Sequence, residues 1–125
     1  MVDFRNNQDI LRTVGGALRE GCVRGRFDYG EAWCRVNNRK YGTVLQCLPV
    51  WYLRKPEPKF GKFRKVSELI SLPINIGVAG RCSQPDSFEW YPDVVRQPPS
   101  MFLRLESARD AGLRGVIAVP VILAS

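Results

Sequence analysis

The chain has 125 residues, and its 19 basic and 12 acidic side chains give a formal net charge of +7 at pH 7. Its hydrophobic content of 45% indicates a folded domain, expected as one unit over residues 1–125 with its core at about 9–123. The chain lacks histidine, which excludes a Ser–His or Cys–His nucleophile pair, and no apolar run reaches the roughly 20 residues of a membrane span.

The first predicted element is an amphipathic helix over residues 9–22. Asp9 is expected at its N-cap, and apolar side chains recur at helical spacing on one face. These side chains are Ile10, Leu11, Val14, Ala17, Leu18 and Cys22. Gly25 favours a stop near Arg24. The residues before this helix include an acid and no apolar segment, so we expect a cytoplasmic protein.

Two strands joined by a tight turn are predicted next. The first covers residues 29–36, and the polar residues 37–40 form a hairpin turn. The second covers residues 43–54 and is apolar on both faces, which predicts that both faces are covered. Pro49 within it indicates an edge position or a bulge.

Residues 55–65 are expected to form a basic loop, with a short helix or irregular segment at 66–70. Phe60 and Phe63 lie among its basic residues, and such a mixture can grip phosphates and stack on bases. The basic cluster consists of Arg54, Lys55, Lys59, Lys62, Arg64 and Lys65. We favour a solvated lid over an anion-binding site for this loop.

The rest of the chain predicts a short helix at 77–83, a strand at 88–94, a helix capped by Ser100 and a strand at 116–123. Gly112 fits a left-handed stop to the second of these helices. The element order predicts the α+β class, with a mainly antiparallel sheet flanked by helices.

Several motifs in this order resemble those of a GAF domain, the small sensory fold of signalling proteins. They are Gly77-Val78-Ala79-Gly80-Arg81, Trp90-Tyr91-Pro92-Asp93-Val94, Ala111-Gly112-Leu113-Arg114 and the apolar strand around Pro120. The segments 29–33 and 49–52 resemble the first strands of a GAF subgroup that precedes kinase or regulator domains. The resemblance implies a further strand and a C-terminal helix beyond residue 123, so we expect a truncated sheet whose open edge favours self-association.

The resemblance also implies where a ligand binds, between the sheet and the loops that cover it. The ligand-binding residues expected on this basis are Trp33, Trp51, Phe63, Arg81, Trp90 and Phe102. The aromatic residues among them also suit a purely structural core. Arg81 suits a ligand anion, or a structural bond to backbone carbonyls or to Asp93.

The cysteines argue against catalysis. Cys22, Cys34, Cys47 and Cys82 form no close pairs, so we expect reduced thiols that pack as small hydrophobes and hold no metal. In free methionine-(R)-sulfoxide reductases, a GAF-like family, cysteines lie inside the glycine turn and before the long helix. Here Cys82 lies beyond the turn, and no cysteine follows it. The motifs of bilin-binding and cyclic-nucleotide GAF domains are also absent, so no cofactor and no catalytic residue are expected.

The sequence therefore predicts a non-catalytic GAF-like regulatory domain of a signalling protein. It would sense a small ligand, form a dimer, or do both, and act on an output domain of the parent chain. The alternative is a nucleic-acid or anion-binding module through residues 54–65, and the third candidate is a degenerate thiol-based methionine sulfoxide reductase-like enzyme. Expected partners are an unknown small molecule and a second copy or output domain; nucleic acid is less favoured, and no membrane partner is expected.

Overall fold

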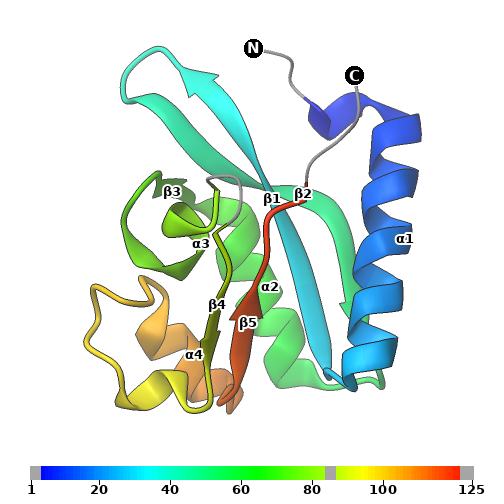
Figure 1. The fold of residues 1–125 in the computed structure, drawn as a ribbon, viewed down its shortest axis with the longest axis vertical. Coiled ribbons are helices and arrows are strands. Elements are labelled where there is room, and N and C mark those ends of the chain that lie inside the picture. The colour runs from blue at the N-terminus through cyan, green and yellow to red at the C-terminus, as the bar shows by residue number, and fades with distance from the viewer. Residues whose placement is uncertain (1–3, 84–86, 122–125) are drawn as a thin grey trace.

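Helix α1 and the helices of the second half of the chain lie on opposite faces of a three-stranded antiparallel sheet (Figure 1). The structure is a computed structural model that describes residues 4–83 and 87–121. A separate two-stranded ribbon lies in the second half. The α+β class predicted from the sequence is confirmed, but the strands are divided between two sheets instead of forming one.

Helix α1 (Gln8–Gly25) follows a single 3-10 turn, η1 (Phe4–Asn6). Asn7, not Asp9, caps the helix, because its side-chain oxygen accepts a hydrogen bond from the backbone N–H of Ile10 at 3.1 Å. Asp9 lies in the first turn instead.

One face of α1 packs on the sheet. Leu11, Val14 and Cys22 are buried, and Leu11 and Val14 form a core with Leu48 of the second strand. Ala17, which the periodicity placed on the same face, is exposed. The predicted buried face is therefore correct at its centre and too wide at its edge.

Strands β1 (Tyr29–Asn38) and β2 (Gly42–Leu53) form the expected hairpin. The side chain of Asn38 accepts hydrogen bonds from the backbone N–H groups of Lys40 and Tyr41, at 2.8 and 3.0 Å, which closes the turn. The register shifts between the pairs Glu31↔Trp51 and Trp33↔Cys47. The extra β2 residues in this shift include Pro49, so the predicted bulge is confirmed.

The expected basic loop at 55–65 is wrong, because most of it is helix α2 (Pro58–Leu69). Glu57 caps this helix by accepting a hydrogen bond from Lys59 N at 3.2 Å. Pro58 occupies the first turn, where its missing N–H costs nothing. Strand β3 (Ser71–Pro73) follows and pairs antiparallel with β2.

The second half of the chain is built from short elements. They are α3 (Gly77–Arg81), β4 (Glu89–Tyr91), the 3-10 turn η2 (Val94–Arg96), α4 (Leu105–Ala111) and β5 (Val116–Ala118). Ser100 does not cap α4, since Arg104 holds the N-cap position. Gly112 ends α4 in the left-handed conformation, with φ of 76°, as predicted.

The predicted strand at 116–123 is shorter in the structure. Only Val116–Ala118 is strand, and it pairs antiparallel with β4. Residues 122–125 lie outside the described part of the chain. The long apolar edge expected from the sequence is therefore reduced to three paired residues within the described part.

The larger core lies between the sheet and the second half. Its buried residues are Phe63, Val78, Val94, Phe102, Ala108 and Ala111. Val94 and Ala108 are completely buried. This core surrounds two charged side chains, which form the site described next.

Candidate functional site

An ion pair between Glu31 and Arg104 lies inside the larger core. Tyr29, Glu31 and Trp33 alternate along β1, so their side chains share the face that looks toward α2 and α4. Glu31 accepts hydrogen bonds from Tyr29 OH at 2.5 Å and from Trp33 Nε1 at 2.9 Å. Arg104 donates through one atom, Nη1, to Glu31 and to Ser67 Oγ.

The surroundings of Glu31 keep it ionised. Burial alone would raise the pKa of this carboxyl. The positive charge of Arg104 and the hydrogen bonds from Tyr29 and Trp33 outweigh burial and lower the pKa below its usual value. Burial, followed by the charge of Glu31, raises the pKa of Tyr29, so the phenol stays protonated and donates.

Aromatic rings enclose the guanidinium of Arg104. Its central carbon lies 4.9 Å from the ring centre of Trp33, 4.7 Å from that of Phe63 and 5.0 Å from that of Phe102. A cation over the faces of aromatic rings is attracted by their negative π surface, and more strongly where water is excluded. The side chain of Arg104 is only 7% exposed, so these contacts contribute to holding its charge in the core.

Two donor groups of Arg104 are not used inside the described part of the protein. Nε and Nη2 have no hydrogen-bond acceptor among the described residues, since both bonds of this side chain leave from Nη1. Neither atom is sealed off: among the described side chains, the one fully buried polar atom without a partner is Nε of Arg35. Arg104 therefore combines a satisfied contact to Glu31 with two donors that are unused and not completely buried.

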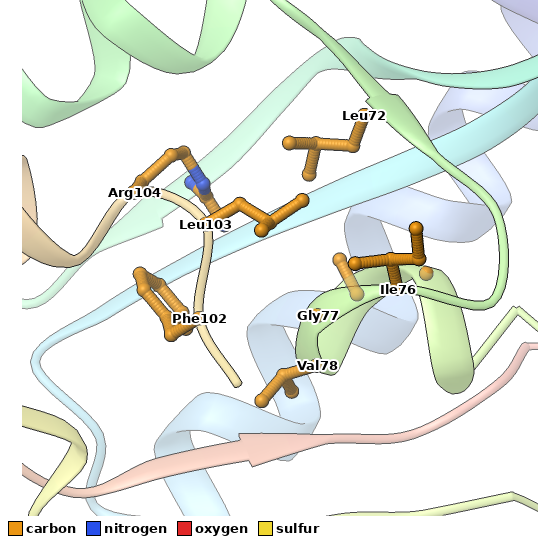
Figure 2. A pocket seen from close by; sticks show the side chains of 9 residues that line it. Leu72, Ile76, Gly77, Val78, Phe102, Leu103 and Arg104 are labelled. Atoms are coloured by element: carbon orange, nitrogen blue, oxygen red, sulfur yellow. The ribbon is translucent and has the colours of Figure 1, made fainter. Parts of the chain in front are cut away.

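A pocket lies beside Arg104, against the glycine turn that opens α3 (Figure 2). It is lined by Leu72, Ile76, Gly77, Val78, Ala79, Gly80, Phe102, Leu103 and Arg104. Its cavity volume is only about 10 Å³, which is room for about one water molecule, and the space around it is partly open to solvent. Drug-sized ligands usually occupy roughly 300–1,000 Å³, so the pocket can admit one small group of a ligand and not a whole molecule.

Two glycines shape the wall of this pocket. Gly77 has φ of 75°, which favours glycine, and its missing side chain leaves room for Leu103. A Cβ on Gly80 would lie 2.5 Å from the carbonyl oxygen of Pro73, so only glycine allows this approach. The backbone N–H of Val78 donates to the carbonyl of Met101 at 2.8 Å. The turn is thereby fastened to the segment that carries Arg104.

The structure brings half of the predicted ligand-binding residues together. Trp33, Phe63 and Phe102 meet around Arg104, and Phe102 also lines the pocket. Trp51 lies elsewhere, half exposed beside Tyr29. Trp90 is also 51% exposed, on the outer face of β4, and does not line the pocket.

Arg81 has a structural partner. It forms two hydrogen bonds with the carboxylate of Glu89, at 2.7 and 2.8 Å, and one with Tyr91 OH at 3.3 Å. The bond to Arg81 is the main reason why the pKa of Glu89 is lowered. Asp93, which the sequence offered as another structural partner for Arg81, pairs with Arg96 and Arg114 instead.

The basic cluster is divided by α2. Arg64 is 4% exposed and points inward, donating to the carbonyl of Leu48 at 2.6 Å and to Sγ of Cys47 at 2.9 Å. Arg54 pairs with Asp28 at 3.2 Å. The exposed members without an acidic partner in the described part are Lys55, Lys59, Lys62 and Lys65. An anion-binding surface here would therefore rest on these lysines alone.

Three of the thiols are poor nucleophiles. Burial raises the pKa of Cys47 to about 12 and that of Cys82 to about 11, and it also raises the pKa of Cys22. All three thiols are therefore protonated near neutral pH. Because the thiolate is the reactive form, they are poorly suited to attack a substrate. Arg81 lowers the pKa of Cys82 only slightly against burial and the charge of Glu89.

The sequence does not predict the polar centre of the site, which consists of the charged pair Glu31 and Arg104 and the hydroxyl of Ser67. One signal was available for Glu31, which alternates with Tyr29 and Trp33 on a face that is otherwise aromatic. Another was available for Arg104, the one charge in the apolar run from Met101 to Leu105. Nothing in the sequence indicated that the two would meet, because 73 positions separate them.

Comparison with known proteins adds no relative. A scan against protein-family models gives no match to the chain, and a search of curated proteins gives none either.

Proposed function

We propose that this chain is a GAF-like regulatory domain of a cytoplasmic signalling protein, without catalytic activity of its own, that senses a small anionic ligand beside Arg104. The observation that carries the proposal is the arginine in the core, whose Nε and Nη2 have no acceptor in the described part of the protein and which borders the pocket at the glycine turn. A carboxylate or phosphate is the natural partner of such a fork of donors.

The contacts of Arg104 suggest how binding would change the domain. An anion that bonds to the unused donors would compete with Glu31 for the same charge and weaken the internal pair. Arg104 belongs to the segment that leads into α4, and Met101 in this segment is bonded to α3. A shift of Arg104 would therefore move α3 and α4 together relative to β1. This movement is the conformational change that the domain would pass to an output domain.

The chemistry of the described side chains supports a binding role over catalysis. The raised pKa values of Cys47 and Cys82 disfavour a thiolate nucleophile, which the methionine sulfoxide reductase alternative requires. The carboxylate of Glu31 is ionised and fully engaged by its three donors. Neither group is placed to exchange a proton with a ligand.

The test is a thermal-shift screen of small carboxylates and phosphates. A ligand that binds only the folded protein should stabilise it by about 2.7 kcal/mol at a hundredfold excess over its Kd. The double variant Glu31→Gln/Arg104→Met removes the charge from the site and should abolish the shift. Arg109→Met, on the exposed side of α4, is the matched control and should retain the shift.

Two outcomes would contradict the proposal. If no compound shifts the transition of the wild-type protein, the sensor function fails for this chain. If a compound stabilises the double variant as strongly as the wild type, the ligand binds through the general positive charge and not at Arg104.

A further inference from the structure

The ribbon formed by β4 and β5 has one buried and one exposed face (Figure 1). Tyr91, Val116 and Ala118 pack against the larger core. The side chains that alternate with them point outward, and all are large and apolar. They are Phe88, Trp90, Ile117, Val119 and Val121, which are 44–69% exposed. We call these five residues the ribbon face.

The ribbon face is continuous and well supported. Trp90 lies directly opposite Ile117 in the antiparallel register, so their side chains are neighbours. Phe27 contacts the edge of Trp90 with ring centres 6.4 Å apart. A Cβ at Gly115 would lie 3.2 Å from the Trp90 ring, which therefore rests close to the backbone. Single exposed apolar residues need no explanation, but a supported group of five does.

Several arginines lie near one end of the ribbon face along the chain. Arg114 precedes Gly115, and Arg26 precedes Phe27, and Gly115 and Phe27 are the residues that lie against Trp90. Arg114 and Arg96 share a single acid, Asp93, at 3.1 and 3.2 Å. One carboxylate cannot balance two guanidinium groups, and Arg26 has no acidic partner in the described part of the chain. This rim is therefore positive.

The positive rim, and the presence of both aromatic and aliphatic side chains on the ribbon face, indicate which kind of partner binds there. A second copy docked symmetrically would offer this rim no opposite charge, because its ribbon face carries the same arginines. Single-stranded nucleic acid stacks on aromatic rings, yet Ile117, Val119 and Val121 offer no ring. Lipid suits both kinds of side chain, because aromatic and aliphatic groups enter the boundary of head groups and acyl chains while arginines bind anionic head groups.

We propose that the ribbon face binds the surface of an anionic lipid bilayer. The described residues contain no helix long and apolar enough to cross a membrane. The expectation of no membrane partner rests on the lack of a membrane-spanning segment. A surface contact requires no spanning segment. The proposal goes beyond the ligand-sensing function and does not depend on Arg104.

The test uses the whole chain and vesicles of phosphatidylcholine, with or without phosphatidylserine as a minor component. Flotation should show binding to the mixed vesicles, weak binding to pure phosphatidylcholine, and loss of binding at high salt. Phe88→Ser/Val119→Ser should abolish binding and leave the thermal transition unchanged, since both side chains are more than half exposed. Arg26→Gln should weaken it by about fivefold.

Two controls distinguish binding through the ribbon face from nonspecific hydrophobic binding to vesicles. Leu69→Ser removes an apolar side chain that is 85% exposed at the end of α2, and should leave vesicle binding unchanged. Trp90→Phe should retain binding but lose the blue shift of tryptophan emission that accompanies it, because Trp90 is then no longer the reporter at the lipid boundary.

Three results would overturn the inference. Equal binding to neutral and anionic vesicles would remove the role of the rim. Binding to an oligothymidylate that depends on Phe88, without vesicle binding, would favour a nucleic-acid platform. Concentration-dependent self-association abolished by the Phe88/Val119 variant, again without vesicle binding, would assign the face to a second copy.

Discussion

Glu31 and Arg104 form an ion pair in the core although 73 positions separate them in the sequence, and their side chains are only 10% and 7% exposed. This pair links β1 to the segment before α4, so it holds the sheet and the second half of the chain together at the site. Its removal should show in stability and not only in ligand binding.

Glu31→Gln should destabilise the protein by about 3–5 kcal/mol, because it leaves the charge of Arg104 buried without a counter-ion. Urea denaturation would measure this cost. The double variant Glu31→Gln/Arg104→Met should cost clearly less than the two single variants combined, since neither charge is then left alone. Additive costs would mean that the two side chains do not depend on each other.

The same pair predicts sensitivity to acid. The folded pKa of Glu31 is lowered from its usual 4.5, so its ionised form contributes stability that is fully present above about pH 4.5. This contribution is lost as the pH falls through the lower folded pKa. The urea midpoint should therefore fall with acidification below about pH 4.5, and less steeply in Glu31→Gln. Glu89 also has a lowered pKa and should account for part of the slope that remains. An unchanged slope in Glu31→Gln would contradict the prediction.

The thiols should react slowly in the native protein. Near neutral pH, Cys47 and Cys82 are protonated, with pKa values raised to about 12 and about 11. Iodoacetamide labelling followed by mass spectrometry should show slow modification of both, and fast modification of the same residues in urea. Rapid native labelling of Cys82, together with methionine sulfoxide turnover, would revive the enzyme alternative.

Helix α2 offers a matched comparison between exposed and buried basic residues. Changing Lys59, Lys62 and Lys65 to Ser should alter stability by no more than about 0.5 kcal/mol per site, since all three are exposed. Arg64→Met should cost about 1–3 kcal/mol, because the carbonyl of Leu48 loses its buried donor. A tight, salt-resistant nucleic-acid complex that the triple lysine change abolishes would instead support the binding-module alternative.

The glycine turn can be tested in the same way. Gly80→Ala should destabilise the protein by roughly 1–3 kcal/mol, because its Cβ would meet the backbone oxygen of Pro73. Gly61→Ala is the control: a Cβ there meets no atom within 4 Å, and alanine favours the helix by about 0.5–1 kcal/mol. Chemical denaturation of both variants gives the comparison. A neutral Gly80→Ala would show that the turn can yield.

The local elements of the fold were largely predictable from the sequence. The hairpin, the bulge at Pro49 and the left-handed stop at Gly112 each depend on a few neighbouring residues with specific backbone preferences. The sequence does not predict helix α2, because Pro58 and the lysines are also typical of a loop, whereas here proline in the first turn and a capping Glu57 begin a helix.

The site was predictable only in its aromatic half. Trp33, Phe63 and Phe102 follow from the tendency of large rings to gather in a core, which made them good candidates. Trp90 lies outside the pocket because its strand carries the side chain outward, and the pairing of β4 with β5 sets that direction. Contacts between distant segments, such as the one that brings Arg104 to Glu31, depend on how the elements pack and not on local pattern.

The distance in sequence between Glu31 and Arg104 also bears on the order in which parts of the chain can pack during synthesis. Helix α1 and the β1–β2 hairpin rely on contacts that close within residues 8–53, so they can assemble early. At that stage the inner face of the hairpin carries a carboxylate whose guanidinium partner has not yet been synthesised. A carboxylate without a counter-ion stays in water, and it keeps the surrounding rings hydrated with it. The inner face can therefore dry, and the larger core can close, only once the segment that carries Arg104 is free to pack on the hairpin.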